Sequence, residues 1–372
     1  MAHQQAPSIL YAGGGSGGHI SPAIAIAEAV ARLRPDARQI VACSDRAIDA
    51  LMLKPTGISF ISTAAAPFST SPRGAIRFVR GWRRTRAAAD DILLERKVDI
   101  VIACGGFVAA PVARAAAKRK IPVLLLNLDA HPGKANRLAA RWATQIVSVC
   151  ETPRLPRFAE MLVPFPLRSS TLATTFGSRD DCCLSLGLNP DRNTLLVTGA
   201  SQGSRSLNEL VPALGKAHPE AFTHWQVYHL CGSDAPEPIS DAYQAAGINA
   251  VVEPFQHEMG RAWSAADLAI SRAGANSVAE IAINCVPTIF LPYPFHRDRH
   301  QFDNAAPLAA CGGAVILDDL VQVQSNLNAH ASSICQLLQA DHRRLAMQAA
   351  LLAELPVNGA EVIAEIALGH TV

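Results

Sequence analysis

A unit of apolar strand, glycine-rich loop and helix occurs twice in the 372-residue chain, and it constrains the possible folds more than any other feature. In the first half, the loop 13–19 (GGGSGGH) follows the apolar run 9–12 and precedes the Ala- and Ile-rich segment 22–33. In the second half, the loop 199–204 (GASQGS) lies between a similar run and a similar segment. Such loops present backbone amides and a helix N-terminus to phosphate. We therefore predict an α/β protein of two Rossmann-like domains that face each other across a cleft.

Length and proline content predict where the domains divide. Single hydrophobic cores stop growing near ~250–300 residues, so a chain of this length is expected to form two domains. Four prolines between positions 153 and 166, followed by a polar stretch, mark the linker. We expect an N-terminal domain over residues 1–166 and a C-terminal domain over residues 167–345. The helical segment 346–372 is expected to pack back on the N-terminal domain.

The composition indicates a globular protein of the cytoplasm. Hydrophobic residues make up 49% of the chain and charged residues 17%, which suits a core-forming protein. A net charge of +2 argues against a nucleic-acid partner. The nine cysteines include no C-x-x-C pair, so neither a zinc site nor a disulfide framework is expected. The N-terminus has no signal-peptide pattern, and no run reaches the ~18 apolar residues of a membrane span.

The first glycine loop alone suggests an NAD-dependent dehydrogenase. Gly13, Gly15 and Gly18 fit the G-x-G-x-x-G spacing of dinucleotide sites. Asp45 is a loose match to the acidic residue that binds the ribose in such sites. This hypothesis explains one motif and gives the second half of the chain no role.

The second glycine loop alone suggests a serine hydrolase. The segment 199–203 fits G-x-S-x-G between a strand and a helix, the context of a nucleophile elbow at Ser201. Asp267 or Asp298, and then His300, follow in the order that such enzymes use. This hypothesis gives the first glycine loop no role.

A glycosyltransferase of the two-domain type B architecture (GT-B) uses both halves, since one domain binds the nucleotide-sugar donor and the other the acceptor. The chain contains no D-x-D pair, so a transferase that chelates a metal is disfavoured. The leaving diphosphate must then be stabilised by helix N-termini and loop amides. The segment 272–277 (RAGANS) opens a helix and is the candidate site. Glu280, one turn later, is expected to accept hydrogen bonds from both ribose hydroxyls.

Five motifs occur in order along nearly the whole chain: GGSGGH (14–19), GGFV (105–108), GASQGSR (199–205), RAGANSVAE (272–280) and HRDRHQ (296–301). Together they resemble the MurG family of peripheral membrane enzymes, which transfer N-acetylglucosamine from UDP-GlcNAc to lipid I in peptidoglycan synthesis. The resemblance implies an inverting hexosyltransferase with a GT-B fold. It implies UDP-GlcNAc as donor, a lipid-linked acceptor, no metal and no other cofactor.

The resemblance also implies roles for individual residues. His19 is the candidate general base, and its unperturbed pKa of about 6.5 suits that role near neutral pH. The acceptor diphosphate is implied to lie against two glycine turns, at Ser16, Gly17, Gly18, Gly105 and Gly106. The UDP-sugar is implied to contact Asp129, Arg168, Ser201, Gln202, Gly203, Gln256, Arg272, Gly274, Ala275, Asn276, Ser277, Glu280, His300 and Gln301. Within that set, the backbone of Gln256 would meet the uracil and Gln301 the sugar hydroxyls.

Three segments depart from the usual family pattern. Residues 126–129 read LNLD in place of His-Glu-Gln-Asn, so Asp129 replaces the asparagine that touches the donor sugar. Residues 109–110 are Ala-Ala in place of Ser-Gly, and residues 300–301 are His-Gln in place of paired glutamines. A carboxylate accepts a sugar hydroxyl but does not donate as an amide does. Three alternatives therefore stay open: a related transferase with another acceptor, a UDP-sugar 2-epimerase, and a nucleotide-sugar binder without catalysis.

The segment 73–86 is the most basic of the chain, with six arginines among apolar residues. The pattern by itself suits either a surface on anionic lipid headgroups or a solvated helix whose apolar stripe packs on its own domain. The segment falls where the MurG family carries its membrane patch, so the resemblance favours the inner face of the cytoplasmic membrane as a partner. The expected patch consists of Ile76, Arg77, Val79, Arg80, Trp82 and Arg83.

Overall fold

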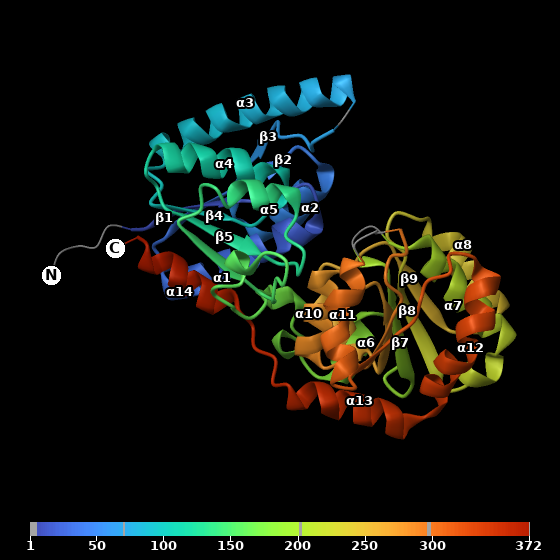
Figure 1. The fold of residues 1–372 in the computed structure, drawn as a ribbon. Helices are drawn as coiled ribbons and strands as arrows, with labels where there is room; N and C mark the ends of the chain where they lie inside the picture. The colour runs from blue at the N-terminus through green and yellow to red at the C-terminus, as the bar shows by residue number, and fades with distance from the viewer. Residues whose placement is uncertain (1–5, 70, 201–202, 296–298, 372) are drawn as a thin grey trace. The chain divides into compact units, whose positions relative to one another are not determined.

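The structure is a computed structural model that describes residues 6–69, 71–200, 203–295 and 299–371. The chain separates into two compact units. Unit 1 comprises residues 1–168 and 358–372, and unit 2 comprises residues 169–357. Each unit contains one six-stranded sheet with helices on both faces (Figure 1). The α/β architecture predicted from the repeated strand–loop–helix unit is therefore confirmed.

Unit 1 is built on a parallel sheet. Its strands are β1 (Ser8–Ala12), β2 (Arg38–Ser44), β3 (Ser59–Thr63), β4 (Ile100–Ala103), β5 (Val123–Asn127) and β6 (Gln145–Ser148). Its helices are α1 (Gly17–Leu33), α2 (Ala47–Leu53), α3 (Pro72–Glu95), α4 (Gly106–Lys118), α5 (Lys134–Ala139) and α14 (Ala360–Gly369). The strand order is β3-β2-β1-β4-β5-β6. Because the order reverses between β1 and β4, the loops that follow these two strands lie together at the carboxyl edge of the sheet.

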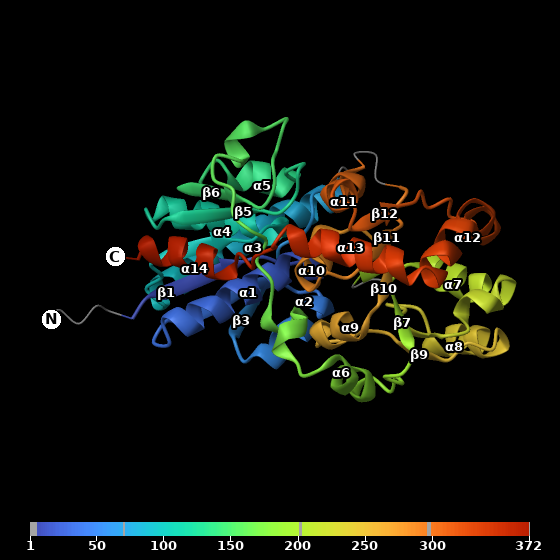
Figure 2. The same cartoon turned by 90° about the horizontal axis from the view of Figure 1, so that it is seen from below.

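Alternating side chains of β1 build the cores on the two faces of this sheet. Ile9 and Tyr11 pack on the face covered by α1 and α14, whereas Leu10 and Ala12 pack beneath α3 and α4. All four side chains are fully buried, as a central strand of a covered parallel sheet requires. Figures 1 and 2 show α14 alongside α1.

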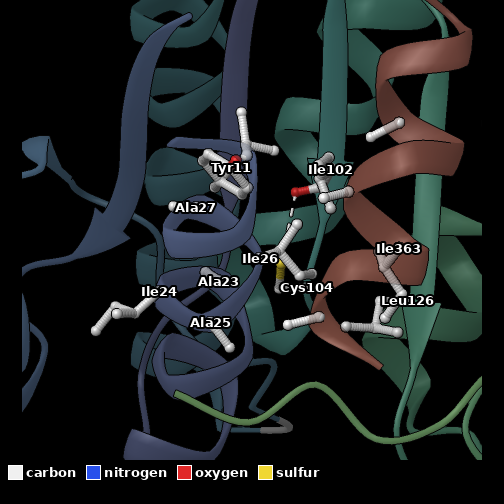
Figure 3. Packing of buried hydrophobic residues seen from close by; sticks show 14 of the residues in the cluster. Tyr11, Ala23, Ile24, Ala25, Ile26, Ala27, Ile102, Cys104, Leu126 and Ile363 are labelled. Atoms are coloured by element: carbon white, nitrogen blue, oxygen red, sulfur yellow. Dashed lines mark hydrogen bonds between the residues drawn. The ribbon is translucent and has the colours of Figure 1, made fainter. Parts of the chain in front are cut away.

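The last helix returns to the core of unit 1. Ile363, Ala364 and Ala367 of α14 are buried in the cluster that holds Ile24 and Leu126 (Figure 3). Where the chain enters this helix, a Cβ on Gly359 would lie 1.8 Å from the carbonyl oxygen of Pro164, so glycine allows the close approach.

Unit 2 repeats the same topology. Its strands are β7 (Asn193–Thr198), β8 (Trp225–Leu230), β9 (Ala250–Glu253), β10 (Leu268–Ser271), β11 (Thr288–Phe290) and β12 (Ala314–Ile316). Its helices are α6 (Arg179–Ser185), α7 (Arg205–Ala217), α8 (Pro236–Ala245), α9 (Met259–Ala265), α10 (Ala275–Asn284), α11 (His300–Ala310), α12 (Val323–Gln339) and α13 (Asp341–Ala353). The parallel strands follow the order β12-β11-β10-β7-β8-β9. The order reverses between β7 and β10, so their loops share the carboxyl edge.

The segment 346–372, expected as a whole on the N-terminal domain, divides between the two units. Met347 of α13 is buried in a core cluster of unit 2, and the guanidinium of Arg344 lies 4.7 Å from the ring centroid of Trp225. The chain passes to unit 1 only at residue 358. The physical reason is the apolar face of α13, which the core of unit 2 covers.

Two helices begin earlier than their prolines predict. Proline is tolerated in the first turn of a helix, so Pro22 and Pro111 by themselves suggest helices that begin at or just before them. The structure instead begins α1 at Gly17 and α4 at Gly106, five residues before each proline. His19 therefore lies in the first turn of α1 rather than in a loop, which fixes the direction of its side chain.

Candidate functional site

A buried carboxylate holds the first glycine loop. Asp49 of α2 is fully buried, and its Oδ2 accepts hydrogen bonds from the amides of Gly15 and Ser44, both at 2.9 Å. The Ser44 hydroxyl donates to the same oxygen at 2.6 Å. The Gly15 amide therefore has a partner within the protein and does not face a pyrophosphate. Asp45, proposed above as a ribose ligand, is exposed. Both observations disfavour the dehydrogenase hypothesis.

Arg46 and Phe107 pack against the same loop. Nη1 of Arg46 donates to the carbonyl oxygen of Gly15 at 2.6 Å, and the guanidinium lies 5.4 Å from the ring centroid of Phe107. Gly15 has a φ of +90°, and a Cβ there would lie 2.3 Å from the Phe107 ring. Only glycine fits this position.

His19 lies between the two glycine turns of unit 1. Its Nδ1 is 2.8 Å from the Oγ of Ser16, the residue that precedes α1. A Cβ on Gly105 would lie 2.6 Å from Cδ2 of His19, and one on Gly106 would lie 3.3 Å from its Nδ1. The structure thus brings Ser16, His19, Gly105 and Gly106 together, with Gly17 and Gly18 in the same helical turn as His19.

Burial lowers the pKa of His19 from its ordinary value of 6.5, while the carboxylates of Asp129 and Asp49 oppose that shift. A lowered pKa keeps the imidazole neutral near pH 7, the form that accepts a proton. Asp129 follows β5, and its backbone oxygen accepts a 2.8 Å hydrogen bond from the side chain of Asn127. Asp129, expected to contact the donor sugar, belongs to unit 1, and its charge acts on His19.

The N-terminus of α10 is the central feature of the predicted UDP-sugar site in unit 2. Gly274 precedes the helix, and Ala275, Asn276 and Ser277 form its first turn. Amides of a first turn point outward along the helix axis and favour an anion such as a diphosphate. Further along the helix, Oε2 of Glu280 accepts a 3.0 Å hydrogen bond from the indole N–H of Trp263.

The loop after β7 is too tight for side chains at its glycines. A Cβ on Gly199 would lie 2.3 Å from the amide nitrogen of Ser204. Gly203 has a φ of +74°, and a Cβ there would lie 2.3 Å from the carbonyl oxygen of Cys231. Ser201 and Gln202, expected to contact the UDP-sugar, lie outside the described residues.

Arg272 was expected to contact the UDP-sugar, but its side chain is buried among internal partners. Its Nη2 lies 2.7 Å from Oδ2 of Asp319 and 2.8 Å from Oγ of Ser206. Its Nη1 donates to the carbonyl oxygen of Leu291 at 2.7 Å. Burial alone would raise the pKa of Asp319, yet hydrogen bonds, led by that from Ser206, and the charge of Arg272 hold it below its ordinary value. The structure therefore assigns Arg272 to loop support.

Two glutamines of the predicted site have side chains bonded within unit 2. Nε2 of Gln256 donates to the Tyr228 hydroxyl at 3.1 Å. The expected contact with the uracil therefore falls to the backbone of Gln256. Oε1 of Gln301 accepts from the amide of Tyr293 at 2.8 Å. His300 and Gln301 open α11, next to the loop that follows β11. Arg168, also expected in this site, is half-buried at the end of the first segment of unit 1.

Of the residues in the serine hydrolase hypothesis, the structure describes Asp267 and His300, and Asp267 is bonded away from the loop 199–204. Asp267 precedes β10, and its Oδ2 accepts from Nη2 of Arg179 at 2.7 Å and from the amide of Thr194 at 2.8 Å. These contacts place Asp267 at the amino edge of the sheet, whereas the loop 199–204 follows the carboxyl end of β7. Asp298, the other candidate, lies outside the described residues.

The basic segment forms part of the 24-residue helix α3. Ile76 and Val79 are exposed by 54% and 48%, and Arg77, Arg80 and Arg83 are exposed beside them. Trp82, expected in the same patch, is half-buried, with its ring centroid 6.2 Å from that of Trp142. It turns inward because its position on α3 faces unit 1. Within the described residues, no helix is both long and apolar enough to span a bilayer.

Three supporting residues were not predicted from the sequence: Asp49, Trp263 and Asp319. Each acts through a partner distant in sequence, and none lies within a recognisable motif. Periodicity marks Trp263 as a core residue but does not reveal the bond that its indole makes. Among the described residues, no three His, Cys, Asp or Glu side chains are grouped to hold a metal ion.

Comparison with known families matches both units. The N-terminal domain of glycosyltransferase family 28 matches residues 9–148, and the C-terminal domain of the same family matches residues 194–355. These ranges cover the glycine turns around His19 and the helix start at Gly274.

Curated relatives extend the match over most of the chain. A UDP-N-acetylglucosamine–N-acetylmuramyl-(pentapeptide) pyrophosphoryl-undecaprenol N-acetylglucosamine transferase from a Nocardioides species is 34% identical over 363 residues, which cover 97% of each chain. The chain belongs to this transferase family, the MurG family. A second member, from Clavibacter sepedonicus, is 33% identical over 313 residues and 83% of each chain.

The fold agrees with this membership. The crystal structure of MurG from Acinetobacter baumannii superposes with a TM-score of 0.72 at 23% identity, covering 98% of this chain and 99% of that chain. The MurG-family fold carries the GT-B architecture that the two glycine loops predicted. Of the sequence hypotheses, the glycosyltransferase is the one that membership of the MurG family supports.

Proposed function

We propose that this chain transfers N-acetylglucosamine from UDP-GlcNAc to the undecaprenyl-pyrophosphoryl N-acetylmuramyl-pentapeptide known as lipid I. The observation that carries the proposal is the 34% identity, over nearly the full chain, to a curated transferase named for this reaction. The chain has a glycine turn at a helix N-terminus in each unit, and the reaction has one diphosphate in each of its two substrates.

The donor is assigned to unit 2. Its diphosphate lies against the first turn of α10, where outward-facing amides stabilise the charge of the leaving UDP. The carboxylate of Glu280, positioned by its hydrogen bond from Trp263, accepts hydrogen bonds from the ribose hydroxyls. The backbone near Gln256 meets the uracil, and the segment at His300 and Gln301 meets the sugar hydroxyls.

The acceptor diphosphate and the base are assigned to unit 1. His19 takes the proton of the acceptor hydroxyl, and the oxygen forms a bond to the anomeric carbon from the face opposite UDP. The bond from that carbon to UDP breaks, and UDP leaves with the electron pair. When Nδ1–H donates to Ser16, Nε2 is the atom that accepts the proton. Attack from the opposite face inverts the anomeric configuration.

The reaction is proposed to need no metal and to occur at the inner membrane surface. Amides of α10 and the first turn of α1 supply the anion stabilisation that a metal otherwise provides. The exposed apolar and arginine side chains of α3 suit a layer of anionic headgroups, with the protein peripheral on that surface.

The test is incubation of the purified chain with UDP-GlcNAc, with and without lipid I, in the presence of EDTA. UDP release that depends on lipid I, together with formation of the disaccharide lipid, is the expected result. Conversion of UDP-GlcNAc to its 2-epimer without acceptor would replace the proposal with an isomerase. Nucleotide binding without turnover on lipid I or other acceptors would replace it with a binding protein. Loss of activity in EDTA, restored by a divalent ion, would overturn metal independence alone.

A further inference from the structure

We propose that Asp129 is a positioning residue for His19, and that its carboxylate stabilises the imidazolium that forms when His19 takes the acceptor proton. The inference rests on the proposed function, because it concerns the base of the proposed transfer. The resemblance implied a contact between Asp129 and the donor sugar, and this proposal gives the residue a role in the proton-transfer step.

The topology of unit 1 brings the two residues to one edge of the sheet. Strand β1 pairs with β4, and β4 pairs with β5, all in parallel. His19 lies in the first turn after β1, Gly105 follows β4, and Asp129 follows β5. The carboxyl ends of neighbouring parallel strands meet, so these three segments are adjacent.

A series of contacts fixes the segments against each other. A Cβ on Gly105 would lie 2.6 Å from the His19 ring and 3.4 Å from Oδ1 of Asn136. The Asn136 amide group donates to the carbonyl oxygen of Leu126 at 3.2 Å. The fully buried Asn127 donates to the backbone oxygen of Asp129 at 2.8 Å. Asp129 is therefore anchored through its backbone beside the histidine, as a positioning residue must be.

Of the carboxylates that act on His19, Asp129 has the larger effect on the histidine pKa. Burial lowers the pKa of His19, and Asp129 opposes this shift more strongly than Asp49 does. The Asp49 carboxylate accepts from Gly15 and Ser44, so its primary role is to hold the loop. Burial raises the pKa of the nearby Cys104 thiol to about 12, so that group stays neutral. The Arg46 guanidinium donates to the Gly15 carbonyl oxygen.

The functional consequence follows from the change in charge during the step. His19 is neutral before proton transfer and cationic after it, so a fixed carboxylate stabilises the product side more than the reactant side. Removing that carboxylate lowers the basicity of His19 and slows proton transfer. It leaves UDP binding in unit 2 unchanged.

The experiment is the pH titration of His19 in the full-length chain by NMR with labelled histidine, its signal assigned from its loss in His19→Gln. Asp129→Asn is expected to lower the pKa of His19, and Asp129→Glu to restore part of it. Glu151→Gln, on the loop after β6, is the matched control and is expected to leave the titration unchanged. In turnover assays, Asp129→Asn should reduce kcat by about 10- to 100-fold, part of the ~10²–10⁴-fold typical of a general base. The acid limb of its pH profile should move to lower pH.

The outcomes separate this proposal from the function on which it rests. An unchanged pKa of His19 in Asp129→Asn overturns the pairing, whatever the activity. A shifted pKa with unchanged kcat overturns the role in proton transfer. A chain that shows the shifted titration but no transferase activity would contradict the proposed function and leave the charge pairing standing. UDP affinity and thermal midpoint verify that each variant is folded.

Discussion

The indole N–H of Trp263 donates a 3.0 Å hydrogen bond to Oε2 of Glu280, and so ties α9 to the carboxylate proposed to bind the ribose. Trp263 is only 2% exposed, which shields the bond from water. Trp263→Phe keeps most of the packing and removes the donor. We expect UDP binding to weaken about tenfold, because a bond to a charged group contributes ~1.5–3 kcal/mol and 1.4 kcal/mol is a factor of ten. Isothermal titration calorimetry with UDP measures this change.

Trp225→Phe is the matched control, since its buried indole donates to the carbonyl oxygen of Leu338 rather than to the site. It should lower stability and leave UDP affinity intact. Glu280→Ala should weaken binding at least as much as Trp263→Phe does. The preference for UDP over 2′-deoxy-UDP should shrink in both site variants. Equal UDP affinity in the wild type and Glu280→Ala would remove the ribose role of this carboxylate.

Replacing His19 distinguishes the role proposed for unit 1 in turnover from the role proposed for unit 2 in UDP binding. His19→Ala removes the proposed base in unit 1, and we expect kcat to fall by about 10²–10⁴-fold. The dissociation constant for UDP should stay within twofold, because the nucleotide is assigned to unit 2 (about 0.4 kcal/mol or less). Steady-state kinetics and calorimetry on the same preparation test this. Equal losses in turnover and in UDP binding would sink the base assignment.

Gly105 tests whether the position of His19 matters. Gly105→Ala would place a Cβ 2.6 Å from Cδ2 of His19 at a φ of +105°, so the imidazole must move. A displacement of about 1 Å costs on the order of 100-fold in turnover. Gly133→Ala is the control, because a Cβ there meets no atom within 4 Å and its φ is −62°. Assays of kcat on both variants decide the point, and similar activities would show that the ring position is unimportant.

Local patterns were sufficient to predict the fold. Both glycine loops lie between a strand and a helix as expected, and each unit is built on a parallel sheet covered by helices. These features depend on residues close in sequence, where apolar runs and glycine punctuation are informative. The helix starts were less predictable, because Pro22 and Pro111 are tolerated inside helices that the glycine turns already begin.

The side-chain contacts of the site depend on tertiary structure. Asp49 reaches Gly15 across 34 positions of sequence, and Trp263 reaches Glu280 across 17. Neither pairing follows from periodicity, because each partner is fixed by how separate helices meet the sheet. The same limit applies to Asp129. Its motif position suggested a contact with the sugar, and only the order of β1, β4 and β5 reveals that its segment also lies near that of His19.

His229 of β8 makes stability depend on pH. It is fully buried, with Nδ1 2.8 Å from the Tyr243 hydroxyl and Nε2 2.9 Å from Oδ1 of Asn208. Burial lowers its pKa from 6.5 to about 3. As pH falls, the unfolded chain therefore protonates His229 before the folded chain does. The contribution of neutral His229 to the free energy of unfolding is present above pH 6.5 and is lost toward pH 3. Between pH 6.5 and 5 the loss amounts to about 2 kcal/mol at 1.36 kcal/mol per pH unit.

Thermal unfolding across this range checks the effect. The midpoint should fall with pH in the wild type and fall less steeply in His229→Gln. His218→Gln is the control, because His218 is a partly exposed residue whose 3.3 Å contact with Glu220 lies at the surface. An identical pH slope in the wild type and His229→Gln would contradict this account.

The outer face of α3 provides the test of membrane binding. Ile76 and Val79 are exposed among arginines that contribute about 1 kcal/mol each near anionic lipid. Burial of an apolar side chain of this size in the interface adds roughly 1.5–3 kcal/mol. Ile76→Asp with Val79→Asp should therefore abolish cosedimentation with phosphatidylglycerol vesicles at moderate salt. Leu94→Asp, near the other end of the helix and 58% exposed, is the control that should still bind. If the double variant and Leu94→Asp bind the vesicles equally, or if salt does not affect binding, the membrane contact lies elsewhere on the protein.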